Sequence, residues 1–145
     1  MHDCAARAEH FVAEMDAAGV DKGIVVQEFV DGAQNDYCVR AMGDYPERLL
    51  CLALPNWWQP GGVETEAEAL LARGFSGLKI PAVHMQGKVR LDDDRLMPVY
   101  ERLEKDEAVL GVDLAEGEDQ VPEMEAILQR CPSLRVALGH FGFPN

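Results

Sequence analysis

His140 is the residue in this sequence whose type and position best suit chemistry. It follows the apolar run 136–138, which predicts a short buried strand, and it lies between Gly139 and Gly142, which allow the backbone to turn. Ligands of parallel α/β proteins bind beyond the carboxyl ends of the strands. An imidazole there can take up and release a proton near neutral pH. We therefore take His140 as the first catalytic candidate; the alternative is a strand-end histidine that hydrogen-bonds a neighbouring loop.

Asp113 is the one charged residue in the preceding apolar run, Ala108–Leu114. Asp113 and His140 lie one strand–helix repeat apart, so both would reach the same edge of a parallel sheet. A carboxylate beside an imidazole orients the ring and raises its basicity, which makes it a better general base. The two residues therefore form a candidate catalytic pair that needs no metal. Alternatively, Asp113 ends its strand with a hydrogen bond to a loop amide.

Trp57 and Trp58 follow the apolar run Leu49–Leu54 after two intervening residues. They could line a substrate pocket or cap the edge of the sheet, and the sequence leaves both readings open. Asp92–Asp94 do not suit a metal site, because consecutive side chains on a helix do not converge. We expect these aspartates to cap and begin a helix instead. His84 is expected to be a loop residue.

A regular alternation of strands and helices must position these residues. Apolar runs and amphipathic stretches alternate with a repeat of 26 to 32 residues, which is the spacing of βα units joined by right-handed crossovers. Strands are expected at 22–27, 49–54, 77–80, 108–114 and 136–138, and helices at about 6–18, 35–44, 63–73, 95–106 and 120–130. The second strand is apolar throughout, which predicts a strand covered on both faces.

Two architectures fit five such units. One is a small doubly wound sheet, although such folds usually begin with a strand and a functional loop after it. The other is part of a (β/α)₈ barrel, which in full needs about 250 residues. This sequence of 145 residues begins in a helix and ends on a strand, as expected for a portion of a longer repeat.

The composition excludes some classes of partner. Twenty-six acidic and thirteen basic residues give a net charge of −13, which argues against binding to nucleic acid or to an anionic membrane. A small-molecule substrate is therefore expected. No apolar run approaches the length of a transmembrane span, and the first residues lack the apolar core of a signal peptide.

The four cysteines show no zinc-finger spacing and no C-x-x-C pair. Cys51 and Cys131 lie within apolar patterns and are expected to be buried thiols. A disulfide framework is not supported, so we expect a reducing compartment and a cytoplasmic location.

Six collinear motifs give the sequence a resemblance to a known family. The chain resembles the amidohydrolase-related metal-dependent hydrolases, a TIM-barrel group that includes aminocarboxymuconate-semialdehyde decarboxylase-like enzymes. The matching motifs are Met15–Lys22, Gln34–Tyr37, Tyr45–Arg48, Gly74–Ile80, Leu91–Tyr100 and Gly139–Gly142. The resemblance covers nearly the whole chain in order, and it implies an internal portion of the barrel, roughly its second to sixth strands.

The resemblance also implies a set of site residues. In the family a divalent metal is held by an H-x-H pair on the first strand, by histidines on later strands and by an aspartate near the end. This sequence contains no H-x-H pair, and Asp113 stands where the fifth strand normally carries a histidine. His140 matches the histidine of the sixth strand. The resemblance therefore implies His140 and Asp113 as metal ligands, with zinc as the expected metal, and Lys79 as a residue that binds a substrate carboxylate; alternatively, Lys79 extends into solvent.

Together these observations predict an α/β fold, a partial (β/α)₈ TIM barrel in one domain over residues 1–145. The expected function is hydrolysis of a small amide, ester or lactone, or decarboxylation of a small carboxylate, with an incomplete site in this chain. His140 and Asp113 are the predicted catalytic residues, and Lys79, Trp57 and Trp58 the predicted substrate contacts. Exposed sheet edges favour self-association into a homo-oligomer. The alternative is a non-catalytic doubly wound module that binds or regulates.

Overall fold

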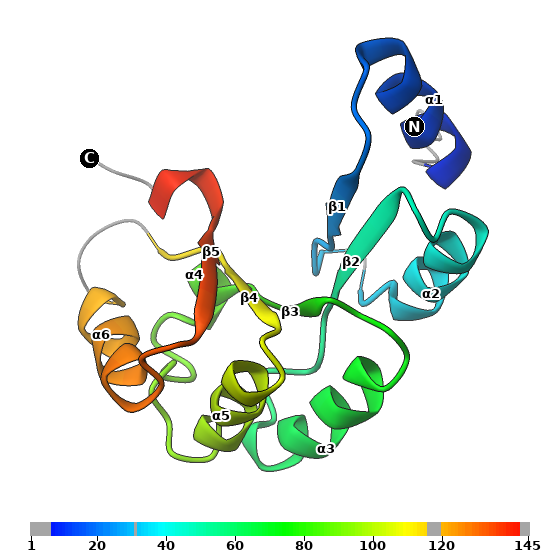
Figure 1. The fold of residues 1–145 in the computed structure, drawn as a ribbon. Helices are drawn as coiled ribbons and strands as arrows, with labels where there is room; N and C mark the ends of the chain where they lie inside the picture. The colour runs from blue at the N-terminus through cyan, green and yellow to red at the C-terminus, as the bar shows by residue number, and fades with distance from the viewer. Residues whose placement is uncertain (1–6, 31, 116–119, 143–145) are drawn as a thin grey trace.

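Five parallel strands form one sheet in the computed structural model, which describes residues 7–30, 32–115 and 120–142. The strands lie side by side in chain order, each pairing with the one before it (Figure 1). Their bounds are β1 Gly23–Val26, β2 Leu49–Ala53, β3 Gly77–Ile80, β4 Val109–Val112 and β5 Arg135–Leu138. The expected strands are confirmed in number, order and parallel direction.

The helices alternate with these strands. Their bounds are α1 Ala8–Ala18, α2 Asn35–Asp44, α3 Pro60–Leu71, α4 Ala82–Met85, α5 Met97–Lys105 and α6 Val121–Arg130, and the 3₁₀ turn η1, Gly139–Gly142, follows β5. Each of α3, α5 and α6 has a proline in its first turn, where the missing N–H costs no helical hydrogen bond. No helix in the described ranges is both long and apolar enough to cross a membrane.

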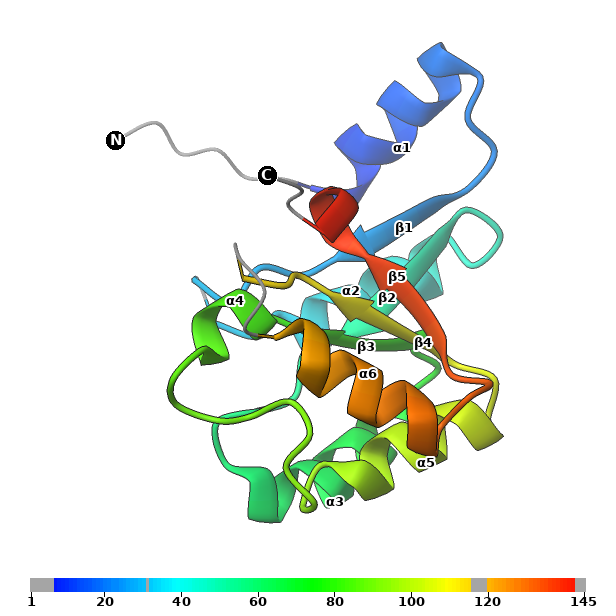
Figure 2. The same cartoon turned by 90° about the vertical axis from the view of Figure 1, so that its left-hand side faces the viewer.

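The sheet is half of a (β/α) barrel. Helices α2, α3, α5 and α6 form an arc along the outside of the curved sheet, and Figure 2 shows α3, α5 and α6 together on that side. A doubly wound sheet instead reverses its strand order and carries helices on both faces. The uninterrupted order β1 to β5 therefore favours the barrel and not the doubly wound module.

The hydrophobic core lies between the convex face of the sheet and these helices. Cys51, Leu78 and Leu110 point into it from neighbouring strands, and all three are fully buried. The opposite, concave face is much more open, because Ile24 is 60% exposed and Val26 is 51% exposed. The prediction that the second strand is covered on both faces is wrong at Leu50, which is 39% exposed, while the other residues of β2 are buried.

β5 also differs from the buried strand that its sequence predicted. It pairs with β4 alone, so it is the edge strand at this end of the sheet. Leu138 pairs in register with the buried Val112, yet it is 52% exposed. Alternation places Leu138 on the helix-covered face, but no described helix reaches the end of the edge strand. Its apolar sequence therefore indicated strand formation correctly and burial incorrectly.

The structure differs from the expected helices at α5 and α4, and at the start of α2. α5 begins at Met97, later than expected. Asp92, Asp93 and Asp94 form ion pairs with nearby arginines, and Asp93 Oδ1 accepts from the Arg95 N–H at 2.9 Å in the turn before the helix. The segment 81–91, expected to be a loop, contains the short helix α4. Asn35 begins α2 but does not cap it; its side-chain amide accepts from the Leu54 N–H at 2.9 Å and donates to the Leu54 carbonyl at 3.0 Å.

Candidate functional site

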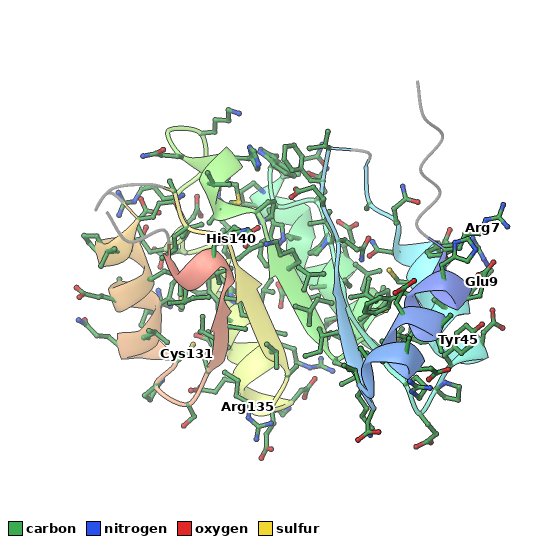
Figure 3. The ribbon with its side chains drawn as sticks, turned by 90° about the horizontal axis from the view of Figure 1, so that it is seen from above. Arg7, Glu9, Tyr45, Cys131, Arg135 and His140 are labelled. Carbon is green, nitrogen blue, oxygen red and sulfur yellow. The ribbon has the colours of Figure 1, made fainter. Side chains whose placement is uncertain are left out.

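Three polar side chains meet at the carboxyl ends of β3, β4 and β5. Lys79 is the third residue of β3, and Asp113 follows β4 directly. His140 lies in the turn η1 after β5, as Figure 3 shows. Lys79 pairs in register with Gly111, so Lys79 and Asp113 both point to the concave face. The predicted convergence of Asp113 and His140 at one edge of the sheet is confirmed, and Lys79 joins them.

Lys79 and Asp113 form a buried ion pair. The Lys79 ammonium donates to Asp113 Oδ2, and the two side chains are 3% and 14% exposed. A buried ammonium is costly unless a carboxylate neutralises it, so the pair holds both side chains in place. The alternative in which Lys79 extends into solvent is wrong. Asp113 uses its carboxylate for this pair, while its backbone carbonyl accepts from the Val83 N–H at 2.7 Å.

His140 lies on the open side of this pair. Its Nε2 is 4.0 Å from Asp113 Oδ1, and its side chain is 63% exposed. This distance is longer than a direct hydrogen bond and lies at the outer limit of an ion pair with a protonated imidazole. The backbone of His140 has a φ of +51°, a left-handed conformation that is uncommon for a residue with a Cβ. The turn thus holds the imidazole near Asp113 at some conformational cost.

Glycines allow the three strands to approach one another here. A Cβ on Gly139 would overlap Asp113 Oδ1 and stand 3.4 Å from the Val112 carbonyl oxygen. At Gly111 a Cβ would stand 2.6 Å from Leu52 Cδ1 and 3.9 Å from Lys79 Cδ. Both positions therefore require the smallest residue for the site to keep this geometry.

A cavity of about 260 Å³ lies over the concave face beside the ion pair. All five strands contribute to its lining. Lys79 and Asp113 lie at its polar end, and apolar residues such as Ile24, Leu50 and Leu52 line the rest. Such a combination of apolar walls with a few polar groups is typical of sites for small molecules.

The two tryptophans have different surroundings. Trp57 is fully buried, its Nε1 donates to the Lys79 carbonyl at 2.6 Å, and its ring lies 6.3 Å from that of Tyr100. It thus supports the backbone of β3 at Lys79 from within the core. Trp58 is half-buried and lines a cavity of about 180 Å³ with Phe29, Pro55 and other residues. Only Trp58 is placed to touch a bound molecule in this structure.

An aromatic cluster at the same end of the sheet was missed from the sequence. The Phe29 ring lies 5.5 Å from the Trp58 ring and 4.2 Å from the His84 ring, measured between centroids. The three residues follow β1, β2 and β3, so their common position after successive strands was the available signal. His84, expected to be a loop residue, lies in α4 with an exposed side chain.

The polar group at the end of β1 was likewise not singled out as a network. The buried Gln27 donates from Nε2 to the Leu52 carbonyl and to Asn35 Oδ1, both at 2.8 Å. Its Oε1 accepts from the Gln34 N–H at 2.7 Å. These bonds tie the end of β1 to the start of α2, which indicates a structural role beside the site.

The described residues offer only part of the ligand set that a divalent metal needs. Asp113 and His140 offer one oxygen and one nitrogen donor, whereas a catalytic zinc takes three protein ligands. The Lys79 ammonium already occupies the Asp113 carboxylate. Within residues 7–30, 32–115 and 120–142, no group of three or more His, Cys, Asp or Glu side chains could hold a metal ion. The described residues therefore do not fit a complete metal site.

Comparison with known proteins gives a family match over almost the whole chain. Residues 2–145 match the family described as amidohydrolase. No curated protein matches the chain. Solved structures match it with TM-scores that establish a common fold, at sequence identities of 15–21%.

Three solved structures illustrate the likeness. An uncharacterised TIM-barrel protein from Bordetella bronchiseptica has a TM-score of 0.77 and 19% identity, over 94% of this chain and 52% of its own. A probable 2-pyrone-4,6-dicarboxylic acid hydrolase from Acinetobacter baumannii has a TM-score of 0.76 and 18% identity, over 98% and 53%. A 5-carboxyvanillate decarboxylase from Novosphingobium aromaticivorans, with bound manganese, has a TM-score of 0.68 and 21% identity, over 92% and 49%. The chain thus spans about half the length of these proteins.

Proposed function

The chain belongs to the amidohydrolase family, and on that basis we propose that it serves hydrolysis of a small amide, ester or lactone, or decarboxylation of a small carboxylate, with a site that is incomplete in this chain and turnover that is impaired accordingly. The observation that carries the proposal is the convergence of Lys79, Asp113 and His140 at the carboxyl ends of adjacent strands. This edge is where barrels of this kind bind their substrates. The neighbouring folds include one protein described as a hydrolase and one described as a decarboxylase.

His140 is the proton carrier in this proposal. Its imidazole is exposed to an incoming molecule, while Asp113 Oδ1 stands 4.0 Å from Nε2. In hydrolysis, Nδ1, the ring nitrogen that does not face Asp113, takes a proton from the attacking water; in decarboxylation, Nδ1 delivers a proton to the carbon that loses carbon dioxide. Asp113 orients the ring and stabilises the imidazolium that forms.

Lys79 supplies positive charge at the polar end of the cavity. One of its three N–H groups goes to Asp113, and the remaining ones can donate to a substrate carboxylate or carbonyl oxygen. The cavity of about 260 Å³ beside it limits the substrate to a small molecule with an apolar body. Trp58 and Phe29 provide an aromatic surface in the separate cavity of about 180 Å³, so Trp58 stays in the proposal as a substrate contact there.

Zinc would bind at this site only if further ligands joined His140 and Asp113. Zinc accepts nitrogen and oxygen ligands, and His140 and Asp113 would contribute one of each. Lys79 competes for the same carboxylate, so the metal would have to displace its ammonium. We therefore derive no catalytic step through a metal.

We also propose a cytoplasmic location and self-association. The free thiols of Cys38, Cys51 and Cys131 are compatible with a reducing compartment. β1 and β5 are the two edges of the sheet, and unpaired edges favour pairing with a second copy.

The decisive experiment measures turnover by the purified, folded chain. Two probes are 2-pyrone-4,6-dicarboxylate, followed by ring opening, and 5-carboxyvanillate, followed by release of carbon dioxide. We expect His140→Ala to lower kcat by about 10²- to 10⁴-fold, the usual contribution of a general acid or base. His10→Ala is the matched control, because His10 is an exposed histidine on α1, outside the site. No turnover by the folded wild-type chain, or equal turnover by His140→Ala, would refute the proposal.

A further inference from the structure

A pair of buried cysteines lies on the opposite face of the sheet from the catalytic candidates. Cys38 belongs to α2 and Cys51 to β2, and their exposed fractions are 2% and 0%. Cys51 pairs in register with Val25, whereas its neighbours Leu50 and Leu52 line the cavity on the concave face. The two thiols therefore belong to a separate environment, beneath α2.

The two cysteines are in direct contact. Cys51 Sγ lies 3.9 Å from the Cys38 carbonyl oxygen, to which its thiol donates. Cys51 therefore packs directly against the residue of α2 that carries the other thiol.

An open cavity lies against this pair, whose side chains are themselves buried. Its volume is about 460 Å³, and it is lined by both cysteines together with residues of α1, β1 and α2. Phe11 and Tyr37 provide apolar and aromatic walls, and Arg7 is the cationic residue among the lining groups. Figure 3 shows Arg7 and Glu9 together on the α1 side of the molecule, where their side chains are 3.8 Å apart.

We propose that Cys38 and Cys51 form a two-thiolate site for a soft monovalent metal ion, Cu(I). Thiolates prefer soft metals. Structural zinc and iron–sulfur clusters need about four protein ligands, and no group of three suitable side chains occurs among the residues that the structure describes. Cu(I) with two sulfur ligands is the soft ion that a pair of thiols can hold.

Binding is a proton-for-metal exchange without electron transfer. One Cu(I) forms two Cu–S bonds, and the two thiol protons go to the solvent. The product carries one net negative charge in an apolar cavity. The Arg7 guanidinium lines the same cavity and offsets part of that charge, since it also pairs with Glu9 at 3.8 Å. This site does not depend on the proposed catalytic function, because it shares no residue with Lys79, Asp113 and His140.

The test is an anaerobic titration of the full chain with Cu(I) against the coloured chelator bicinchoninate. We expect the wild type to remove one equivalent of Cu(I) from the chelator, and Cys38→Ser and Cys51→Ser each to lose that equivalent. Cys4→Ser and Cys131→Ser are matched controls, because they remove the other two thiols of the chain, and both should keep it. Failure of the folded wild type to compete, or retention of the equivalent by Cys38→Ser, would overturn the proposal.

A second measurement covers the case in which Cys51→Ser does not fold. The double variant Cys4→Ser/Cys131→Ser retains only the proposed pair of thiols. X-ray absorption at the copper edge of its Cu(I) complex should show two sulfur ligands. A spectrum with one sulfur and a nitrogen or oxygen ligand would overturn the site as described.

Discussion

Breaking the Lys79–Asp113 pair should destabilise the chain unequally, depending on which partner is removed. Asp113→Ala leaves the Lys79 ammonium without its carboxylate at 3% exposure. Loss of one partner of a buried pair costs about 3–5 kcal/mol. We expect the lower end, about 3 kcal/mol, because Asp113 lies at the carboxyl end of β4, where it is partly exposed. Lys79→Met keeps the apolar stem and leaves Asp113 at 14% exposure, where water still reaches it, so we expect about 1–2 kcal/mol.

Urea unfolding followed by circular dichroism measures this difference. With an m-value of about 1.5 kcal/mol/M, Asp113→Ala should lower the midpoint by about 2 M and Lys79→Met by about 1 M. The double variant Lys79→Met/Asp113→Leu should recover most of the loss, because an apolar pair of similar volume replaces both charges. Lys22→Met, at an exposed lysine, is the control and should leave the midpoint within about 0.3 M. Equal losses for the two single variants, or losses that simply add in the double variant, would refute the reasoning.

Three further predictions concern the turn, the acidic segment and the sheet edge. Gly139→Ala should push the Asp113 carboxylate away and cost about 1–3 kcal/mol in the same urea assay; an unchanged midpoint would contradict the tight approach. Hydrogen bonds from Arg95 lower the pKa of Asp93 to about 2, so Asp93 should stabilise the fold above its unfolded pKa of about 3.9 and lose that effect as pH falls toward 2. Asp93→Asn should therefore lower stability at pH 7 by about 1 kcal/mol or less and make no difference near pH 2; a constant difference across that range would rule this out. If the β1 edge mediates self-association, Val26→Lys should shift the mass measured by light scattering toward the monomer, and a wild-type chain that is monomeric at all concentrations would exclude such association.

The repeat of strands and helices was predictable because it depends on local pattern. Apolar runs such as Gly77–Ile80 and the amphipathic stretch that became α6 were identified with small shifts at their ends. The shift at α3 reflects Pro60, which enters the first turn, and the shift at α5 reflects aspartates that pair with arginines. The exact start of a helix depends on contacts with residues distant in sequence, and the hydrophobic periodicity of the segment indicates it only weakly.

The site was predictable in part. His140 and Asp113 were expected at one edge of the sheet, since consecutive parallel strands present their carboxyl ends together, and the structure confirms it. The partner of Asp113 was not predicted, because the Lys79 side chain reaches it across the β3–β4 register. The two tryptophans are adjacent in sequence but differ in burial. Trp57 lies within the core, whereas Trp58 is half-buried and lines the cavity of about 180 Å³.

The amino-acid sequence by itself determined the types and order of the elements, the parallel sheet, and which polar residues stand at the strand ends, because these follow from periodicity and repeat length. The tertiary structure alone decided that the helices cover one face of the sheet, that β5 is an exposed edge, and that Lys79 neutralises Asp113. It also brought Cys38 and Cys51 into contact from a helix and a strand. Burial and pairing of this kind depend on which surfaces meet after the chain has folded. The sequence pattern of one segment does not determine which other segments will pack against it.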